Sequence, residues 1–269
     1  MYSEEELQRS LTTQIFGRKL FVYDSIDSTN SHAKILANKG AEEGTVVIAD
    51  HQTDGRGRFG RTWQAESGNN LLFTIIIRPT FSIDKIGLLP FFAAAGIALA
   101  VETVTGMQCE CKWPNDILLN DKKCCGILME STFQQNKLDY VIIGIGLNVN
   151  QKNFLGDLEG KATSLSSECS TEFDKRNVFC QIMSSLESLY TYVRKGDFKS
   201  VLMEWKARAA IFGKRIMLTQ AGNIIDGVAI ALADDGGLIV ETRTGQHVFH
   251  AGNVTIAKQQ INDTLRKKN

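Results

Sequence analysis

The sequence lacks a net charge, a secretory signal and an apolar run long enough to cross a membrane. Its 269 residues include 30 lysines and arginines and 30 aspartates and glutamates, so no global field attracts nucleic acid or an anionic membrane. The acidic residues 1–6 contain no apolar core of a signal peptide. The longest apolar run, Ile86 to Val101, contains Pro90 and is shorter than the roughly 20 residues of a membrane span. We expect a cytoplasmic protein in which local basic patches bind any anion.

Metal-binding and disulfide patterns are also missing. No C-x-x-C occurs, and the four histidines do not have zinc-ligand spacing. A disulfide scaffold is unexpected in a chain of this size without an export signal. We therefore expect reduced, partly buried thiols. Cys124 and Cys125 would make activity sensitive to oxidation only if they were exposed and ionised.

The common nucleotide-binding signatures are absent or incomplete. Gly55, Gly57 and Gly60 match G-x-G-x-x-G, but the dinucleotide fold requires a helix directly after the loop, and here a strand is predicted. The chain contains neither the H-R-D and D-F-G motifs of protein kinases nor the G-K-[ST] of a Walker A loop.

Residues 55–61 read G-R-G-R-F-G-R, and this segment is called the Gly-Arg loop below. Glycines allow the backbone to approach a ligand closely, and arginines supply forked donors for phosphate or carboxylate. A second polar cluster, Lys112–Asp116, reads K-W-P-N-D and is followed after a short turn by Lys123. Read separately, these segments are either an anion site or a basic surface loop and a solvated turn.

Two further segments combine polar groups with local structure. Asp27–Asn30 precedes a predicted helix, where it serves as a cap or binds a small polar group at the helix N-terminus. Gly144–Asn148 ends an apolar strand with two glycines, which indicates a bulge or a close approach by another group. Asn148 then either enters a site or forms a plain turn.

The order of predicted elements favours an α+β protein. Its strands are 17–26, 44–50, 70–78, 109–119, 124–133 and 140–149, and its helices are 28–38, 88–104, 171–194 and 197–209. Tight turns between successive strands predict a largely antiparallel sheet. Thr171 followed by Asp174 is a capping pattern, and the polar residues 153–170 are expected to form a loop.

The pattern changes after residue 209. Short predicted strands cover 215–219, 224–232, 238–241, 247–249 and 254–257, with turns at 221–223 and 234–237. About fifty residues of short strands indicate a small barrel. We expect one domain over 1–209, a second over 210–269, and a frayed tail after Lys258.

Together, the motifs resemble biotin protein ligase. The matching segments are, in chain order, Asp27–Asn30, Gln52 with Gly55–Arg61 and Trp63, Lys112–Asp116, Lys123–Gly126 and Gly144–Asn148. The Gly-Arg loop and K-W-P-N-D are highly specific as a pair. The resemblance is close from about Phe21 to Val149 and looser beyond. It implies a biotin- and ATP-binding catalytic domain over 1–209, similar to class II aminoacyl-tRNA synthetases with a mixed or antiparallel sheet, and an SH3-like barrel over 210–269.

The resemblance implies a two-step ligase reaction. The carboxylate of biotin attacks the α-phosphate of ATP, with Mg²⁺, to give biotinyl-5′-AMP and pyrophosphate. A lysine of a biotin carboxyl carrier protein then attacks the mixed anhydride. Only about twenty residues precede the first predicted strand, so we expect the form without an N-terminal DNA-binding domain. No DNA or membrane partner is expected, and a homodimer is left open.

The resemblance also assigns roles to matching positions. Residues expected at biotin are Ser28, Thr29, Asn30, Gln52, Gly55, Arg56, Gly57, Arg58, Lys123 and Gly126. Residues expected at ATP and the adenylate are Arg56, Arg61, Trp63, Lys112, Asn115, Lys123 and Asn148. Lys112, Arg58 and Asp116 are expected to be catalytic, with Asp116 also assisting Mg²⁺. Closure of the Gly-Arg loop would shield the anhydride from water.

Two alternatives remain open. A lipoate or octanoate transferase of the related fold would bind acyl chains that lack the ureido head of biotin. A non-enzymatic module that binds RNA through the Gly-Arg loop would show steep salt dependence, but only Phe59 and Trp63 supply nearby aromatic rings.

Overall fold

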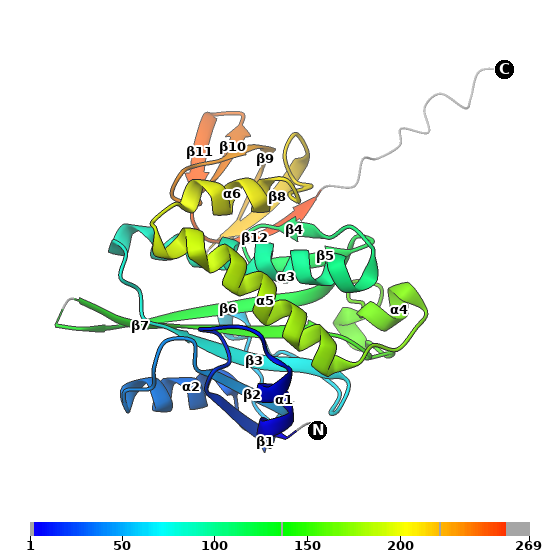
Figure 1. Ribbon diagram of the computed structural model, residues 1–269. Helices are drawn as coiled ribbons and strands as arrows, with labels where there is room; N and C mark the ends of the chain where they lie inside the picture. The colour runs from blue at the N-terminus through cyan, green and yellow to red at the C-terminus, as the bar shows by residue number, and fades with distance from the viewer. Residues whose placement is uncertain (1–2, 136, 221, 257–269) are drawn as a thin grey trace. The chain divides into compact units, whose positions relative to one another are not determined.

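The computed structural model describes residues 3–135, 137–220 and 222–256, and the chain divides into two compact units, Met1–Ala210 and Ile211–Asn269 (Figure 1). The helices are α1 (Glu4–Ser10), α2 (Thr29–Asn38), α3 (Leu89–Thr105), α4 (Leu165–Cys169), α5 (Lys175–Arg194) and α6 (Phe198–Lys206). The strands of the first unit are β1 (Leu20–Ile26), β2 (Val46–Gln52), β3 (Asn70–Ile77), β4 (Glu110–Lys112), β5 (Asp116–Leu119), β6 (Lys122–Gln134) and β7 (Lys137–Asn148). The strands of the second unit are β8 (Arg215–Gln220), β9 (Asn223–Leu232), β10 (Leu238–Thr242), β11 (Gly245–Phe249) and β12 (Asn253–Ile256).

One mixed sheet organises the first unit, in the order β1-β2-β3-β7-β6-β5-β4. The β1–β2 pair is parallel because α2 crosses over between these strands, whereas every other neighbouring pair is antiparallel. The expected α+β class with a mixed or antiparallel sheet is therefore confirmed.

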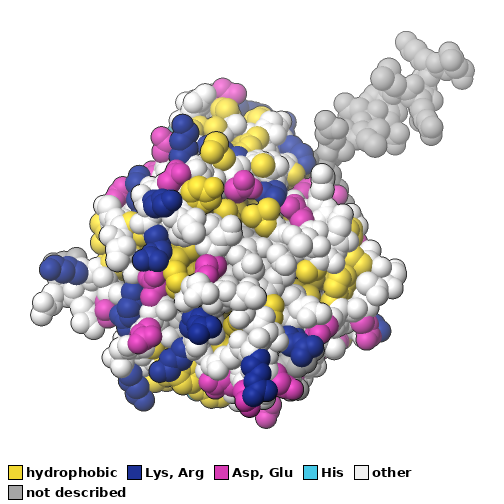
Figure 2. Space-filling model, viewed as in Figure 1, with side chains coloured by type: hydrophobic (Ala, Val, Ile, Leu, Met, Phe, Trp, Pro, Cys, Tyr) yellow, Lys and Arg dark blue, Asp and Glu magenta, His cyan; other side chains and the backbone are white. Residues whose placement is uncertain are grey.

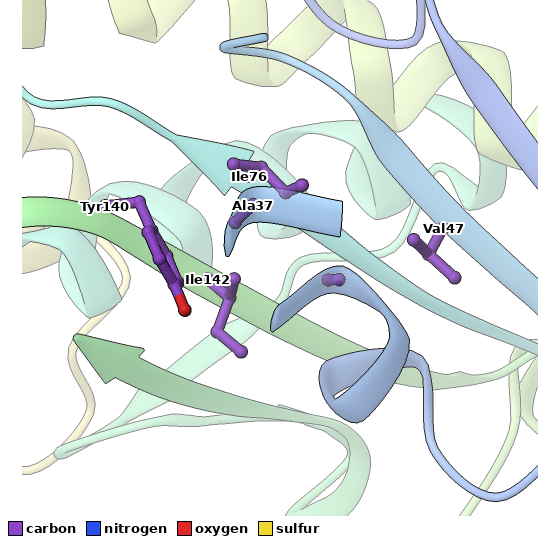
Figure 3. Packing of buried hydrophobic residues seen from close by; sticks show 6 residues of the cluster. Ala37, Val47, Ile76, Tyr140 and Ile142 are labelled. Atoms are coloured by element: carbon purple, nitrogen blue, oxygen red, sulfur yellow. The ribbon is translucent and has the colours of Figure 1, made fainter. Parts of the chain in front are cut away.

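The two faces of this sheet have different neighbours. On one face, Ala33 and Ala37 of α2 pack against Val47, Ile76 and Ile142 (Figure 3). On the other face, Phe73 of β3 meets Phe179 of α5 edge to face, with 5.5 Å between the ring centroids. Since side chains alternate along a strand, each strand presents one set of residues to α5 and the other set to α2. The α2 face therefore carries the polar groups described below.

The apolar helix α3 lies in the core. Pro90 occupies its first turn, and Gly106 ends it in a left-handed conformation with φ of 70°. Together with the preceding 3₁₀ turn (Ile83–Leu88), this segment covers 23 residues and is long and apolar enough to cross a membrane, so the expectation that no apolar run reaches that length was wrong. However, 72% of its most apolar window is buried inside the protein, which is typical of a core helix.

Three local predictions were wrong. The predicted strand 109–119 is two strands, because a turn containing the cis Trp113–Pro114 peptide separates β4 from β5. The predicted loop 153–170 contains a 3₁₀ turn (Gly156–Leu158) and α4. Helix α5 begins one turn after Thr171, because Asp174 is itself the N-cap and accepts a hydrogen bond from the N–H of Arg176.

The N-terminal segment holds an unpredicted helix and an anchor to α5. Ser3 and Glu6 form a reciprocal capping box at the start of α1. Beyond the helix, the Glu187 carboxylate of α5 accepts the backbone N–H groups of Gln14, Ile15 and Phe16 at 2.6–3.0 Å. These three bonds tie the chain before β1 to the helical face of the sheet.

The second unit is a five-stranded antiparallel sheet in the order β11-β10-β9-β8-β12. Exposed and buried residues alternate along β8, and Ile216 and Leu218 point inward. This alternation is that of a small β-domain with one core-facing side. Parts of three predictions lie outside the described residues: residue 221 of the predicted turn 221–223, residue 257 of the predicted strand 254–257, and the whole predicted tail after Lys258.

Charges on the surface are mixed. Basic and acidic side chains are interspersed on the face of the first unit that carries α5 (Figure 2). This mixture agrees with the equal numbers of basic and acidic residues in the sequence. A local cluster of side chains that all carry positive charge is therefore a distinct feature of the fold.

The cysteines of β4 and β6 and the preceding Cys109 are buried. Cys109, Cys111, Cys124 and Cys125 are at most 4% exposed, and all are free thiols. Burial raises the pKa of Cys109 and of Cys111 to about 12, and it also raises the pKa of Cys124 and Cys125. Neither condition for oxidation sensitivity at Cys124 and Cys125, exposure or ionisation, is met.

We predict that these four thiols resist alkylation in the folded protein. At pH 8, a thiol of pKa about 12 is ionised to a fraction of only about 10⁻⁴, and burial excludes the reagent. Iodoacetamide labelling followed by peptide mapping should modify the partly exposed Cys169 and Cys180 first, and all six cysteines only in guanidinium. Early labelling of Cys124 or Cys125 would contradict the structure.

Candidate functional site

The Gly-Arg loop folds back on itself as a tight hairpin after β2. The N–H of Trp63 donates to the carbonyl of Gly55 at 2.9 Å, and the N–H of Gly57 donates to the carbonyl of Arg61 at 2.6 Å. A side chain at Gly55 would lie 2.6 Å from the Trp63 carbonyl oxygen, so glycine is required for this close approach. At the tip, Phe59 adopts φ of 57° and is 64% exposed.

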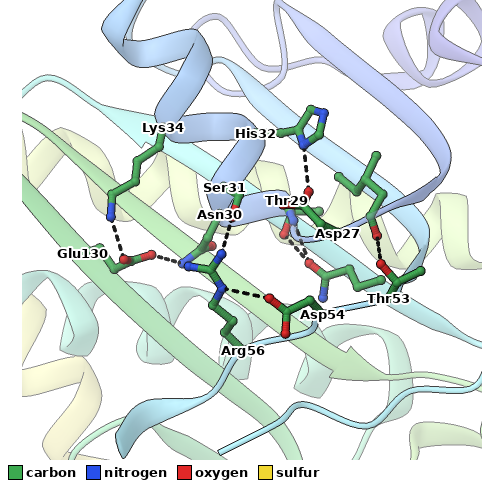
Figure 4. Close-up of polar contacts among 12 residues, drawn as sticks. Asp27, Thr29, Asn30, Ser31, His32, Lys34, Thr53, Asp54, Arg56 and Glu130 are labelled. Atoms are coloured by element: carbon green, nitrogen blue, oxygen red, sulfur yellow. Dashed lines mark hydrogen bonds and ion pairs between the residues drawn. The ribbon is translucent and has the colours of Figure 1, made fainter. Parts of the chain in front are cut away.

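Two arginines connect this hairpin to separate parts of the first unit. Arg56 Nη2 donates to Ser31 Oγ of α2 at 2.6 Å (Figure 4). Arg58 Nη1 donates to Asn115 Oδ1 at 3.1 Å. Asn115 is fixed in turn by two bonds with Ile127 of β6, through its side-chain amide and its carbonyl. The loop therefore bridges the N-terminal end of α2 and the K-W-P-N-D turn.

Four cationic side chains meet around one carboxylate. Asp116 Oδ1 lies 2.6 Å from Lys123 Nζ, outside hydrogen-bond angles, so the attraction is that of an ion pair. Burial lowers the pKa of Lys112, Asp116 opposes this shift, and Lys123 and Arg61 add to it. Burial likewise lowers the pKa of Arg58, which interacts with Asp116 and Arg61. We call Arg58, Arg61, Lys112, Lys123 and Asp116 the cation cluster. Four positive charges and one negative charge leave an excess of three.

Trp63 lies against two glycines beside this cluster. A Cβ atom at Gly146 would be 2.5 Å from the indole ring, and one at Gly126 would be 2.7 Å from it. Lys123 Nζ lies 5.3 Å from the Trp63 ring centroid, within cation–π range. The indole Nε1 is buried without a hydrogen-bond partner among the described residues. The paired glycines of β6 and β7 thus make room for a flat aromatic group on the sheet.

A buried polar network lies at the other end of the same face. Gln52 Oε1 accepts from the N–H of Thr29 at 2.7 Å and from its hydroxyl at 2.9 Å. The Thr74 hydroxyl lies 2.8 Å from Thr29 Oγ1 and 2.7 Å from Asn30 Oδ1. Ser28 is the N-cap of α2 and is 1% exposed, but its side chain makes no capping hydrogen bond. The predicted Ser28 cap is therefore formed by backbone geometry alone.

Asn148 is the last residue of β7, the strand that carries Gly144 and Gly146. Its Nδ2 donates to the Thr163 carbonyl at 2.9 Å, whereas its buried Oδ1 has no partner among the described residues. A buried acceptor without a donor is costly unless a ligand supplies one. The chain bends directly after Asn148 at residues 149 and 150, so both sequence alternatives stay predictions.

The predicted site residues gather on one face of the sheet in two groups. Ser28, Thr29, Asn30, Gln52 and Arg56 lie around the N-terminus of α2, and the cation cluster lies beside Trp63 and Gly126. Sequence reasoning missed Thr74, Glu130 and Lys34. The only signals were a hydroxyl within the apolar strand 70–78 and a lone carboxylate in the strand 124–133.

The described residues form no ready-made metal centre. Among the described residues, no group of three or more His, Cys, Asp or Glu side chains could hold a metal ion. Asp116 is a single carboxylate that is already paired with Lys123. Mg²⁺ usually takes one or two carboxylates together with substrate phosphates, so these residues fit a magnesium ion that arrives with a nucleotide.

Known proteins share both the sequence and the fold of this chain. Residues 22–148 match the Biotin/lipoate A/B protein ligase family, and residues 211–256 match the Biotin protein ligase C terminal domain. The chain is 35% identical over 256 residues to the Bifunctional ligase/repressor BirA of Bacillus subtilis (strain 168), covering 94% of this chain and 79% of that protein. It is 29% identical to the Biotin--[acetyl-CoA-carboxylase] ligase of Mycobacterium tuberculosis, covering 92% and 94% of the two chains.

A solved structure gives the same result. The biotin protein ligase from Aquifex aeolicus, in complex with biotin and ATP, superposes with a TM-score of 0.77 and 26% identity, over 90% of this chain and 99% of that chain. The resemblance inferred from the sequence motifs is confirmed. The chain belongs to the Biotin/lipoate A/B protein ligase family, and its C-terminal match and its relatives place it among the biotin protein ligases.

Proposed function

We propose that this protein is a ligase that activates biotin with ATP to biotinyl-5′-AMP and transfers the biotinyl group to a lysine of a biotin carboxyl carrier protein. The observation that carries the proposal is that the cation cluster and the buried polar network lie on the same face of one sheet. The three excess positive charges of the cluster favour binding of a polyanion. The protein as a whole has no net charge, so this excess is local to the site. A triphosphate next to a carboxylate substrate matches this demand.

The residues divide the first step between them. The network at the N-terminus of α2 offers hydrogen bonds to the ureido head of biotin, and the Gln52 amide nitrogen has no protein partner among the described residues. Lys112, Arg58 and Lys123 stand where charge develops on phosphate oxygens during adenylate formation, so they stabilise the transition state. Trp63 offers a stacking surface for adenine, and the free Asn148 Oδ1 offers an acceptor for its amino group.

Magnesium and the second substrate complete the proposal. When bound through phosphate oxygens and Asp116, Mg²⁺ would neutralise charge on the leaving pyrophosphate. The Gly-Arg loop, held by Ser31 and Asn115, covers the site and keeps water from the mixed anhydride. The carrier lysine then attacks the biotinyl carbonyl and releases AMP. The absence of DNA and membrane partners and the cytoplasmic location stay predictions, and a homodimer is left open.

The direct test mixes the protein with biotin, ATP, Mg²⁺ and a carrier domain, and follows carrier mass and pyrophosphate release. The proposal expects a biotinylated carrier and pyrophosphate release only when biotin is present. Transfer of lipoate or octanoate in place of biotin would favour the alternative transferase. No modification with any of the three acids would contradict both functions.

We predict that Lys112→Ala lowers the rate of adenylate formation by about 10²–10³-fold, because an aimed donor to a developing anion is lost. Its thermal stability should not fall, since one of four mutually repelling cations is removed. Lys122→Ala is the matched control, because Lys122 is a neighbouring lysine that pairs with Glu168 instead. Single-turnover pyrophosphate release measures both variants, and a near-normal rate for Lys112→Ala would remove its assigned role.

We predict that alanine at two glycines of β7 weakens the binding of different substrates. A Cβ at Gly146 would meet the Trp63 ring at 2.5 Å, whereas a Cβ at Gly144 would meet Asn30 Oδ1 at 2.1 Å. Gly146→Ala should raise KM for ATP by about tenfold or more, and Gly144→Ala should do the same for biotin, since each displaces a different contact. Each variant is the control for the other, and equal changes in both constants would refute the two-part site.

A further inference from the structure

Glu130 contacts the buried polar network at the N-terminus of α2, and its carboxylate has no role in the proposed function. It follows Gly126 and Leu128 on the same face of β6, and it lines a pocket of about 490 Å³ beneath the Gly-Arg loop. Its side chain is 27% exposed. Figure 4 shows it between Lys34 and Asn30 of α2.

Glu130 contacts Asn30, whose side-chain amide has two orientations related by a 180° rotation. Asn30 Nδ2 donates to Glu130 Oε2 at 2.9 Å and lies 3.4 Å from the Leu128 carbonyl oxygen. Its Oδ1 accepts from the Thr74 hydroxyl at 2.7 Å. Asn30 is 4% exposed, so water does not compete strongly for these bonds.

The carboxylate decides which way this amide points. A carboxylate and a carbonyl can only accept hydrogen bonds, so an Asn30 amide turned by 180° would place its oxygen against two acceptors. The observed orientation places Oδ1 over Gly144, where an added Cβ would come within 2.1 Å of it. Asn30 therefore presents an acceptor, and not a donor, on the Gly144 side of the network.

Lys34 keeps Glu130 in this position. Lys34 Nζ donates to Glu130 Oε1 at 2.8 Å, which leaves Oε2 for Asn30. Burial raises the pKa of Glu130, but the hydrogen bonds from Lys34 and Asn30 and the charges of Lys34 and Arg56 outweigh burial and lower it. The carboxylate thus stays ionised at neutral pH and cannot itself become a donor.

We propose that Glu130 is a positioning residue that sets ligand specificity by holding the Asn30 amide with its oxygen toward the substrate. A ligand whose head carries N–H groups, such as the cyclic urea of biotin, satisfies that oxygen. An acyl chain without such groups leaves this buried oxygen with the Thr74 hydroxyl as its one donor, so it gains no hydrogen bond from the ligand. The inference rests on the proposed function, because it names how the same pocket prefers a ureido ligand to a simple acyl chain.

The test is Glu130→Gln, which keeps the size of the side chain but can itself donate to Asn30. Both orientations of the Asn30 amide then become allowed. We expect the Kd for biotin, by calorimetry, to rise about tenfold, which corresponds to about 1.4 kcal/mol. The Kd for octanoate and the KM for ATP should stay within about twofold, so the ratio of biotin to octanoate affinity falls. A merely structural defect would change all three.

The matched control is Asp139→Asn. Asp139 is also a carboxylate of the sheet with a cationic partner, Arg78, and it is 26% exposed, but it does not contact Asn30. This variant should leave the biotin Kd unchanged. Thr74→Val supplies a second measurement, because its effect should be smaller in the Glu130→Gln background than in the wild type if both act through Asn30.

The outcomes separate the two proposals. Wild-type protein that binds biotin, together with a Glu130→Gln variant of unchanged biotin affinity and unchanged selectivity, overturns the inference alone. Wild-type protein that does not bind biotin overturns the proposed function as well. If Glu130→Gln does not fold, Lys34→Met gives the answer: a lowered ratio of biotin to octanoate affinity supports the inference, and an unchanged ratio overturns it.

Discussion

Mutual repulsion among the four positive side chains around Asp116 is the constraint on which the rest of the site depends. Like charges repel more strongly in a partly buried site than in water, and one carboxylate offsets only part of the repulsion among the four. The Asp116–Lys123 pair at 2.6 Å holds the centre together. A phosphate chain relieves what remains, so the folded protein is organised for an anion before one is bound.

The sheet brings these charges together from distant parts of the sequence. The Gly-Arg loop follows β2, Lys112 ends β4, and Lys123 is near the start of β6. Antiparallel pairing places Asp116 of β5 opposite Lys112 of β4, and Asp116 also forms the ion pair with Lys123 of β6. The bond from Arg58 to Asn115 brings in the loop. On the same face, glycines of β6 and β7 leave room for Trp63 and Asn30. One face of one sheet therefore supplies an anion site, a stacking surface and a polar pocket.

The sequence predicted the parts of this site whose chemistry is local. The Gly-Arg loop and K-W-P-N-D are contiguous, and their residue types by themselves indicate anion binding, so both could be identified. The boundaries of β4 and β5 could not be predicted, because the turn between them is held by pairing of Asn115 with Ile127 of β6, twelve residues away. A polar segment such as 165–169 becomes helical only with its cap at Ser164.

Glu130 and Thr74 could not be predicted as site residues, because their significance comes from what lies opposite them. Thr74 is opposite Gly144 in the sheet and under Asn30, 44 residues away in sequence. Glu130 meets Asn30 across 100 residues. Long-range pairing of this kind has no local pattern, whereas the alternation of residues along β6 and β7 fixes it once the register is known.

Exchange of labelled pyrophosphate into ATP tests the central claim most directly, because it reports formation of an acyl adenylate from a carboxylate at the cation cluster without any carrier protein. The account predicts exchange that requires both Mg²⁺ and biotin, and that octanoate supports poorly. Exchange that proceeds equally without biotin, or no exchange with biotin present, would contradict it.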